Sequence, residues 1–400
     1  MRRLTCASLA GACLLLAATT GARAAGTGGP SDAQLVAGHR PAAGTTEAEL
    51  WYGMSQAEKE LRTSPLLVRD PELNAYVRDV LCKVSGDYCG DLRLYLLDVP
   101  VFNASMAPNG VTIVFTGALL RMRNEAELAY VLAHEFAHYK ARHSLQSWEK
   151  TKRTTAFLST FSLFTLGLDG GLSGSLAYMM GLGGLASHSR DKEREADAIG
   201  FQAAAAAGYD PQAVVAMWQR VLEEEQADPR YKKGTGAFAS HPKTQERIED
   251  NRQAAAAVSQ GHTGWQLGQE RHQQQQDRFL AHWLEQEIGR RKYDVSLEVI
   301  GEVDEGIDAG DRAITTFYLA EAHRRRDRAG DRAAALDLYR QSIALPGAPA
   351  AAWREYGLAE YSLGNRDAAR QSLQRYLALA PNAEDAPYIN QYIHQTETES

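Results

Sequence analysis

Hydrophobic residues recur at helical spacing over most of the chain, and one short region has a strand-like pattern. Residues 47–62 and 70–84 carry apolar side chains three and four positions apart, and the second stretch opens with an Asp-Pro cap signal. Residues 91–99 and 111–120 are strand-like instead, and the sequence APNG between them is typical of a turn. The pattern predicts a mainly α protein with a small β-sheet.

A long helix is predicted from Asn124 to about residue 150. Asn124 is a good N-cap, and Glu127 follows three positions later, as in a capping box. The next segment, residues 157–186, is apolar but broken by Asp169 and many glycines, without a clean run of 18 apolar residues. This favours buried hairpin-like helices or a lid over a membrane span, with contact at a bilayer surface as the alternative.

The last hundred residues repeat with a period of 34 residues. The small and large residues that recur are Gly330, Ala335 and Tyr339, then Gly364, Ala369 and Leu373. Together with Trp353, Tyr356, Gly357 and Pro381 they match the tetratricopeptide pattern of helix-packing residues. The alternative is a set of unrelated amphipathic helices. A polar, Gln-rich stretch before this region indicates a boundary.

These patterns divide the chain into five parts. We expect a signal peptide at 1–24, a flexible lead-in at 25–46, a first domain at 47–265, a polar linker or helix at 266–290, and tetratricopeptide-like repeats at 291–396.

The N-terminus has the three-part composition of a secretory signal. Arg2 and Arg3 precede an apolar stretch, and small residues lead to a predicted cleavage site near Ala24. A lipoprotein signal ending at Cys13 is the alternative. Export leaves Cys82 and Cys89, which are close enough in sequence to predict a disulfide, the alternative being two reduced thiols.

Chain length, composition and net charge limit the classes of function that this chain can have. The 400 residues are 44% hydrophobic and 23% charged, enough for two or three domains with a sizeable core. The formal net charge is -7 and no Lys/Arg-rich run occurs, so we expect no nucleic-acid partner.

The candidate chemistry lies in the long helix, in the sequence HEFAH. His134 and His138 are four residues apart and so share one helix face, where two imidazoles can bind a single ion. Glu135 points to the side, where it can act as a general base toward a water molecule but is poorly placed as a ligand. The pattern predicts one Zn²⁺ per chain, against the alternative of an ordinary helix with solvated histidines.

A third protein ligand must come from elsewhere. Ala141 and Ser144 stand where a metzincin needs glycine and histidine, which excludes that arrangement. His143 comes one residue early and, on a continuing helix, faces away from that direction, so we expect a surface or second-layer residue.

The sequence SRDKEREAD offers carboxylates on a later helix. Glu193 and Asp197 share one face, whereas Glu195 falls on the opposite side. One of the pair can bind the metal while the other accepts a hydrogen bond from a ligand histidine.

Three motifs in order, NEAELAYVLAHEFAHYKARHS, SRDKEREAD and SHPKTQERI, resemble the HtpX-type and CAAX-prenyl-protease family of zinc metallopeptidases, which are gluzincins. The resemblance covers roughly residues 47–255. It implies a gluzincin-type peptidase domain followed by an α-helical repeat solenoid, with Glu193 as third ligand and Asp197 as its second-layer partner. Integral-membrane relatives carry several spanning helices, and this chain has no convincing one, so membrane-embedded substrates are in doubt.

Two residues of the third motif remain open. His241, in a polar loop before Pro242, is an oxyanion donor, a fourth zinc ligand that holds the enzyme latent, or a structural histidine. Arg247 binds substrate or forms a structural salt bridge. His188 is a weak second-layer candidate. Residues 111–115 (VTIVF) are expected to form an edge strand onto which an extended peptide adds.

The expected function is a periplasmic zinc endopeptidase that cleaves misfolded or stalled envelope proteins, with Glu135 as general base. We expect residues 291–396 to recruit substrates or outer-membrane barrel assembly machinery, and we leave peripheral membrane contact open. The alternatives are a chaperone or scaffold with a mostly silent zinc site, and a processing protease with one native substrate.

Overall fold

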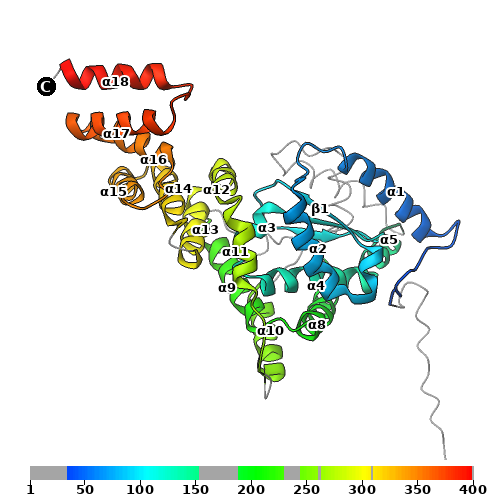
Figure 1. The fold of residues 1–400 in the computed structure, drawn as a ribbon. Coiled ribbons are helices and arrows are strands. Elements are labelled where there is room, and N and C mark those ends of the chain that lie inside the picture. Colours follow the sequence, from blue (N-terminus) through cyan, green and yellow to red (C-terminus); the bar gives the residue numbers. More distant parts are fainter. Residues whose placement is uncertain (1–33, 153–187, 229–243, 260–262, 308–309, 399–400) are drawn as a thin grey trace, which may run out of the picture.

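The computed structural model describes residues 34–152, 188–228, 244–259, 263–307 and 310–398. A three-stranded sheet with helices on both faces forms the first half, and a row of helices leads away from it to the C-terminus (Figure 1). The predicted signal peptide, the Gly-rich segment 157–186 and His241 lie outside the described residues. Among the described helices, none is long and apolar enough to cross a membrane.

The elements of the first half are α1 (Thr46–Leu61), α2 (Pro71–Ser85), the 3-10 helix η1 (Gly86–Asp91), β1 (Arg93–Leu97), β2 (Ala104–Met106), β3 (Val111–Phe115), α3 (Thr116–Arg121), α4 (Glu125–Lys140), α5 (His143–Lys152), α8 (Arg190–Ala206), α9 (Gln212–Ala227) and α10 (Thr244–Ser259). Those of the second half are α11 (Gln269–Asp277), α12 (Leu280–Gly289), α13 (Tyr293–Gly306), α14 (Arg312–Arg326), α15 (Asp331–Ala344), α16 (Ala350–Ser362), α17 (Arg366–Leu379) and α18 (Ala386–Thr398).

The sheet has the order β1-β3-β2, with β1 parallel and β2 antiparallel to β3. Side chains of β3 alternate between two clusters: Ile113 packs toward α1 and α5, and Val114 packs toward α2 and α4. The prediction that VTIVF is an edge strand is therefore wrong. Because the chain forms β1 on one side of β3 and the β2 hairpin on the other, β3 is central and β2 is an edge strand among the described residues.

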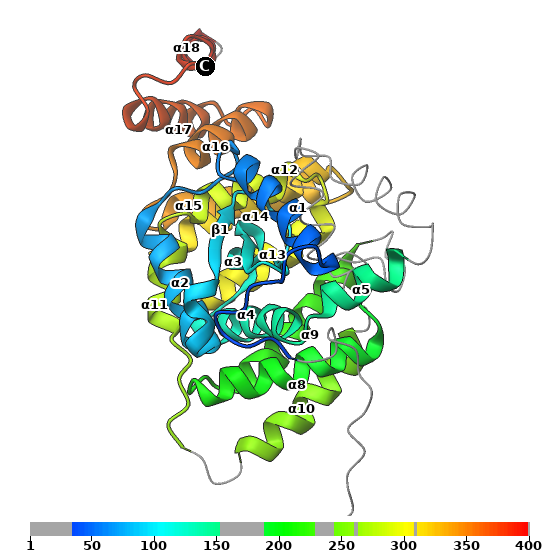
Figure 2. The same ribbon diagram turned by 90° about the vertical axis from the view of Figure 1, so that its right-hand side faces the viewer.

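The helix with the HEFAH sequence begins as predicted. The Asn124 side chain accepts a hydrogen bond from the Glu127 amide at 3.0 Å, and a Glu127 carboxylate oxygen accepts from the Arg123 amide at 2.9 Å. The resulting helix α4 is buried along its length from Glu125 to Tyr139. In Figure 2 it lies between the sheet and α8.

The predicted continuation of this helix to residue 150 is wrong. α4 ends at Lys140, Arg142 adopts a left-handed conformation with φ 58°, and α5 begins at His143. Arg142 donates to the Glu47 carboxylate of α1 at 2.6 Å, which fixes the turn. Residues after the turn therefore point in directions that a single helix would not give them.

The expected flexible lead-in and the expected polar linker or helix are both packed onto the first half. The amide of Leu35 donates to the Lys140 carbonyl at 2.8 Å, and its side chain is buried. In the Gln-rich stretch, α11 buries His272 and Gln276, whose side chains bond to carbonyl oxygens of residues 119–122 at 2.9 to 3.0 Å. A Gln-rich helix can be buried here because its amides have backbone partners.

The second half is a helical solenoid, as the 34-residue period predicted. Neighbouring helices pack in pairs, with α14 against α15 and α16 against α17 (Figure 1). The repeating Ala335, Tyr339, Ala369 and Leu373 are all buried. A methyl group on Gly357 would lie 2.8 Å from the Leu373 side chain, which explains the small residue at this repeat position.

A buried ion cluster joins the two halves. Arg121 of α3 bonds to Glu224 of α9 at 2.6 Å and to Glu287 of α12 at 2.8 Å.

The structure pairs Cys82 and Cys89 as a disulfide, with Cα atoms 4.7 Å apart.

Candidate metal centre

Three side chains from two helices converge on one point. The Nε2 atoms of His134 and His138 lie 3.0 Å apart. The Glu193 carboxylate of α8 lies 3.6 Å from Nε2 of His134 and 3.5 Å from Nε2 of His138. All three side chains are buried, and their donor atoms face one another.

These separations fit a zinc ion. Bonds of about 2.0–2.1 Å at tetrahedral angles place neighbouring donor atoms about 3.3 Å apart, and the observed distances are 3.0, 3.5 and 3.6 Å. Two imidazoles and one carboxylate are also the donor set of catalytic zinc sites that keep a position for water.

α8 reaches α4 because of Gly200. A Cβ on Gly200 would lie 2.8 Å from the His134 amide nitrogen and 2.9 Å from the Ala133 carbonyl. Only glycine allows this approach. Glu193, Asp197 and Gly200 follow one another at helical spacing on the same side of α8, so the close contact brings both carboxylates to the histidines.

Asp197 and Arg247 support His134. Asp197 Oδ1 lies 3.0 Å from Nδ1 of His134, and Arg247 of α10 grips the same carboxylate with Nε at 2.9 Å and Nη2 at 2.6 Å. Burial raises the pKa of Asp197, but Arg247 and His134 outweigh it, so the pKa lies well below its ordinary value. Asp197 is therefore ionised and holds the proton of His134 on Nδ1, so the lone pair on Nε2 can bind a metal.

The Nδ1 atom of His138 faces a second histidine rather than a carboxylate. It lies 2.9 Å from Nδ1 of His143, whose Nε2 lies 3.2 Å from Oε2 of Glu195. The His188 ring stacks on His138, with centroids 4.2 Å apart. Burial lowers the pKa of His143 below its ordinary value. His143, expected at the surface or in a second layer, lies in a second layer behind His138, because the left-handed turn at Arg142 points it inward.

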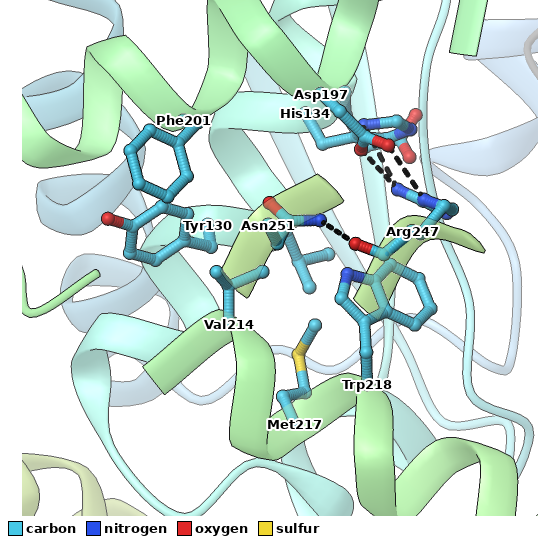
Figure 3. Close-up of a pocket in the computed structure, with 11 residues that line it drawn as sticks. Tyr130, His134, Asp197, Phe201, Val214, Met217, Trp218, Arg247 and Asn251 are labelled. Carbon is cyan, nitrogen blue, oxygen red and sulfur yellow. Dashed lines mark hydrogen bonds and ion pairs between the residues drawn. The ribbon is translucent and has the colours of Figure 1, made fainter. Parts of the chain in front are cut away.

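A pocket opens beside His134 and Glu135 (Figure 3). Its wall is largely apolar and comes from α4, α8 and α9: Tyr130, Val131, Phe201, Val214, Met217 and Trp218. Arg247 and Asn251 also line it, and the Arg247 guanidinium lies 4.0 Å from the Trp218 ring centroid. Glu135 thus lies between this pocket and the side chains of His134, His138 and Glu193, which we call the candidate ligand group.

Two buried polar atoms at the pocket have no hydrogen-bond partner among the described residues. They are the hydroxyl oxygen of Tyr130 and Nη1 of Arg247. Nη1 lies 4.0 Å from Oε2 of Glu193, on the side of the ligand group. Buried polar atoms are normally bonded, so Nη1 of Arg247 is a candidate donor to a bound molecule.

The structure thus brings together His134, Glu135, His138, Glu193, Asp197 and Arg247. Sequence reasoning missed Trp218, which gave no signal beyond that of a core aromatic residue. His241 lies outside the described residues.

Comparisons with known proteins agree with the motifs. Residues 67–255 match the sequence model of Peptidase family M48, and residues 321–394 match that of a tetratricopeptide repeat. These matches confirm the family resemblance and the repeats.

Curated relatives share part of the chain. Mitochondrial metalloendopeptidase OMA1 of Schizosaccharomyces pombe is 37% identical over 179 residues, 43% of this chain and 50% of the relative. Beta-barrel assembly-enhancing protease of Yersinia pestis is 31% identical over 211 residues, 49% of this chain and 42% of the relative, and the Escherichia coli (strain K12) protein of that name is 28% identical over 207 residues with the same coverage. The chain spans about half the length of the curated relatives it matches.

Proposed function

We propose that the chain is a zinc-dependent endopeptidase, because residues 67–255 match the sequence model of Peptidase family M48 and residues 321–394 match that of a tetratricopeptide repeat. The observation that carries this proposal is the convergence of His134, His138 and Glu193 at donor separations suited to one zinc ion. His134 and His138 bind through Nε2, and Glu193 supplies the carboxylate.

The reaction proposed is hydrolysis of a peptide bond. Bound zinc would polarise the peptide carbonyl and the attacking water, lowering the pKa of that water. Glu135, one residue from a ligand and buried at the mouth of the pocket, takes a proton from the water and returns it to the leaving amine. Arg247, held by Asp197, donates from Nη1 to a backbone carbonyl of the substrate.

Substrate binding uses two features that both contact α4, the strand β2 and the pocket beside His134. An extended peptide adds to β2, the sheet edge that packs against α4, in place of the strand the sequence first indicated. One substrate side chain enters the apolar pocket of Figure 3. Backbone pairing is largely independent of sequence, which suits an enzyme that acts on misfolded chains.

The cellular role proposed is quality control of envelope proteins in the periplasm. Its support is the N-terminal signal pattern and the relatives named beta-barrel assembly-enhancing protease. In such an oxidising compartment the Cys82–Cys89 pair forms a disulfide. The repeats, residues 291–396, recruit unfolded substrates or barrel assembly machinery.

Glu135→Gln is the central test. The variant should retain one zinc per chain and lose cleavage of casein, while chelator should abolish cleavage by the wild type. Wild-type cleavage by Glu135→Gln would reject Glu135 as the base. Casein cleavage that chelator leaves intact would reject the metallopeptidase, and a purified wild type that binds zinc but cleaves nothing would favour the chaperone or scaffold.

His241 is proposed as a fourth ligand that holds the enzyme latent. Its replacement by alanine should then raise casein cleavage. Lower cleavage would indicate an oxyanion donor instead, and unchanged cleavage a structural histidine.

A further inference from the structure

The imidazoles of His134 and His138 differ in the group that faces Nδ1, the ring nitrogen that does not point toward the proposed metal. Nδ1 of His134 faces a carboxylate directly, Oδ1 of Asp197 at 3.0 Å. Nδ1 of His138 faces another imidazole, Nδ1 of His143 at 2.9 Å. An imidazole that binds a metal through Nε2 carries its proton on Nδ1. His138 must therefore donate this hydrogen bond, and His143 must accept it.

This assignment fixes the proton on His143 as well. Since Nδ1 of His143 accepts, its single proton is on Nε2, which lies 3.2 Å from Oε2 of Glu195. The hydrogen bonds then run in one direction, from His138 through His143 to a carboxylate. His143 is fully buried, whereas the Glu195 side chain is 52% exposed, so the series ends at the surface.

The local backbone is built to present His143. Arg142 holds a left-handed conformation, with φ 58°, which is unfavourable for a residue other than glycine. Its bond to Glu47 stabilises the turn, and the Lys192 ammonium donates to the His143 carbonyl at 3.0 Å. Contacts from α1 and α8 thus fix the backbone that carries the His143 imidazole.

We propose that His143, anchored by Glu195, is a positioning residue that sets the tautomer and ring orientation of His138 for metal binding. The inference rests on the proposed function, because it assigns His138 as a zinc ligand. His188, stacked on the face of His138, restricts the same ring in the remaining direction.

The test compares four variants of the full chain. His143→Leu removes both hydrogen bonds, and His143→Asn keeps an acceptor oxygen near the position of Nδ1. Glu195→Ala removes the anchor, and Asp191→Ala removes an exposed carboxylate from the same helix as a matched control. Zinc affinity is measured by competition with a chromophoric chelator, and ligand geometry by the visible absorption spectrum of the cobalt-substituted protein.

Loss of an outer partner of a ligand histidine weakens metal affinity about 10–100-fold. We expect that loss and a changed cobalt spectrum for His143→Leu, substantial recovery in His143→Asn, a smaller loss in Glu195→Ala, and wild-type affinity in Asp191→Ala. A space-filling role would give the two His143 variants similar affinities.

The outcomes separate this inference from the proposed function. Wild-type affinity and spectrum in His143→Leu would overturn the inference while leaving the peptidase intact. A wild type that binds no zinc would overturn both. If His143→Leu does not fold, equal zinc affinity of Glu195→Ala and Asp191→Ala overturns the anchoring.

Discussion

Gly200 of α8 lies against the backbone of His134 in α4, so closely that a methyl group would come within 2.8 Å of the His134 amide nitrogen. The absence of a side chain therefore sets the distance between the two helices that carry the ligand group. Glu193 and Asp197 reach the histidines only because this distance is short.

Gly200→Ala should destabilise the protein and weaken zinc binding together. Backbone atoms are the obstacle, and they cannot move aside like a flexible side chain, so a cost of about 1–3 kcal/mol is expected. Urea unfolding and chelator competition measure the two effects. Gly301→Ala is the control, because nothing lies within 4 Å of its added methyl group. Gly301 lies in the middle of α13, so Gly301→Ala should raise the free energy of unfolding by up to about 1 kcal/mol. A Gly200→Ala protein as stable as the control would contradict the close approach.

Replacement of Arg247 should lower the free energy of unfolding, because Asp197 loses its ion-pair partner. Arg247→Leu leaves the buried Asp197 carboxylate without its strongest partner, and breaking such a pair costs about 3–5 kcal/mol. Arg247→Lys keeps the charge but not the two-pronged contact, so an intermediate loss is expected. Urea unfolding of the metal-free proteins ranks them. Equal stability of the leucine variant and wild type would show that the pair contributes nothing.

Removal of Arg121 should weaken the joint between the two halves. Arg121→Met leaves Glu224 and Glu287 with less compensation in a buried place, so a loss of about 3–5 kcal/mol is expected. The combination of Arg121→Met with Glu224→Gln should recover part of it, because one uncompensated charge is then gone. Thermal unfolding of both variants makes the comparison. No recovery in the combination would argue against charge as the cause.

Stability should fall in mild acid because of His272. Burial lowers the pKa of His272 to about 4 from an ordinary value of 6.5, and the neutral ring accepts from Tyr76 and donates to the Met122 carbonyl. Between these pH values the unfolded chain binds a proton that the folded chain excludes. The free energy of unfolding therefore falls by up to about 1.4 kcal/mol per pH unit as pH decreases.

The check is urea unfolding at pH 7, 5.5 and 4.5, with chelator present to remove metal effects. His272→Gln should have a shallower pH dependence than wild type, whatever its stability at pH 7. Parallel curves for the two proteins would exclude His272 as the source.

The sequence predicted the structure correctly where a single capping residue or the spacing along one helix determines the geometry. The Asn124 cap predicted where α4 begins, and helical spacing predicted that His134 and His138 share one face and that Glu193 and Asp197 share another, as they do in the structure. These features depend on helix geometry alone, which every sequence with the right period shares.

Other features depend on contacts between distant segments. The left-handed turn at Arg142 is held by Glu47, 95 residues away, so the sequence around residue 142 reads as uninterrupted helix. The position of β3 in the sheet depends on which strands flank it, and alternation along one strand does not encode that. Burial of Gln276 likewise depends on carbonyl oxygens more than 150 residues earlier in the chain.

The buried amide of Gln276 bears on how this chain can be divided for study. Truncation at residue 265, where composition changes, would strip the carbonyl oxygens of Leu119, Leu120 and Met122 of their donor, just ahead of Asn124. A minimal fragment that carries the candidate metal centre should instead extend through Gly289, so the glutamine-rich stretch belongs with the first half of the chain.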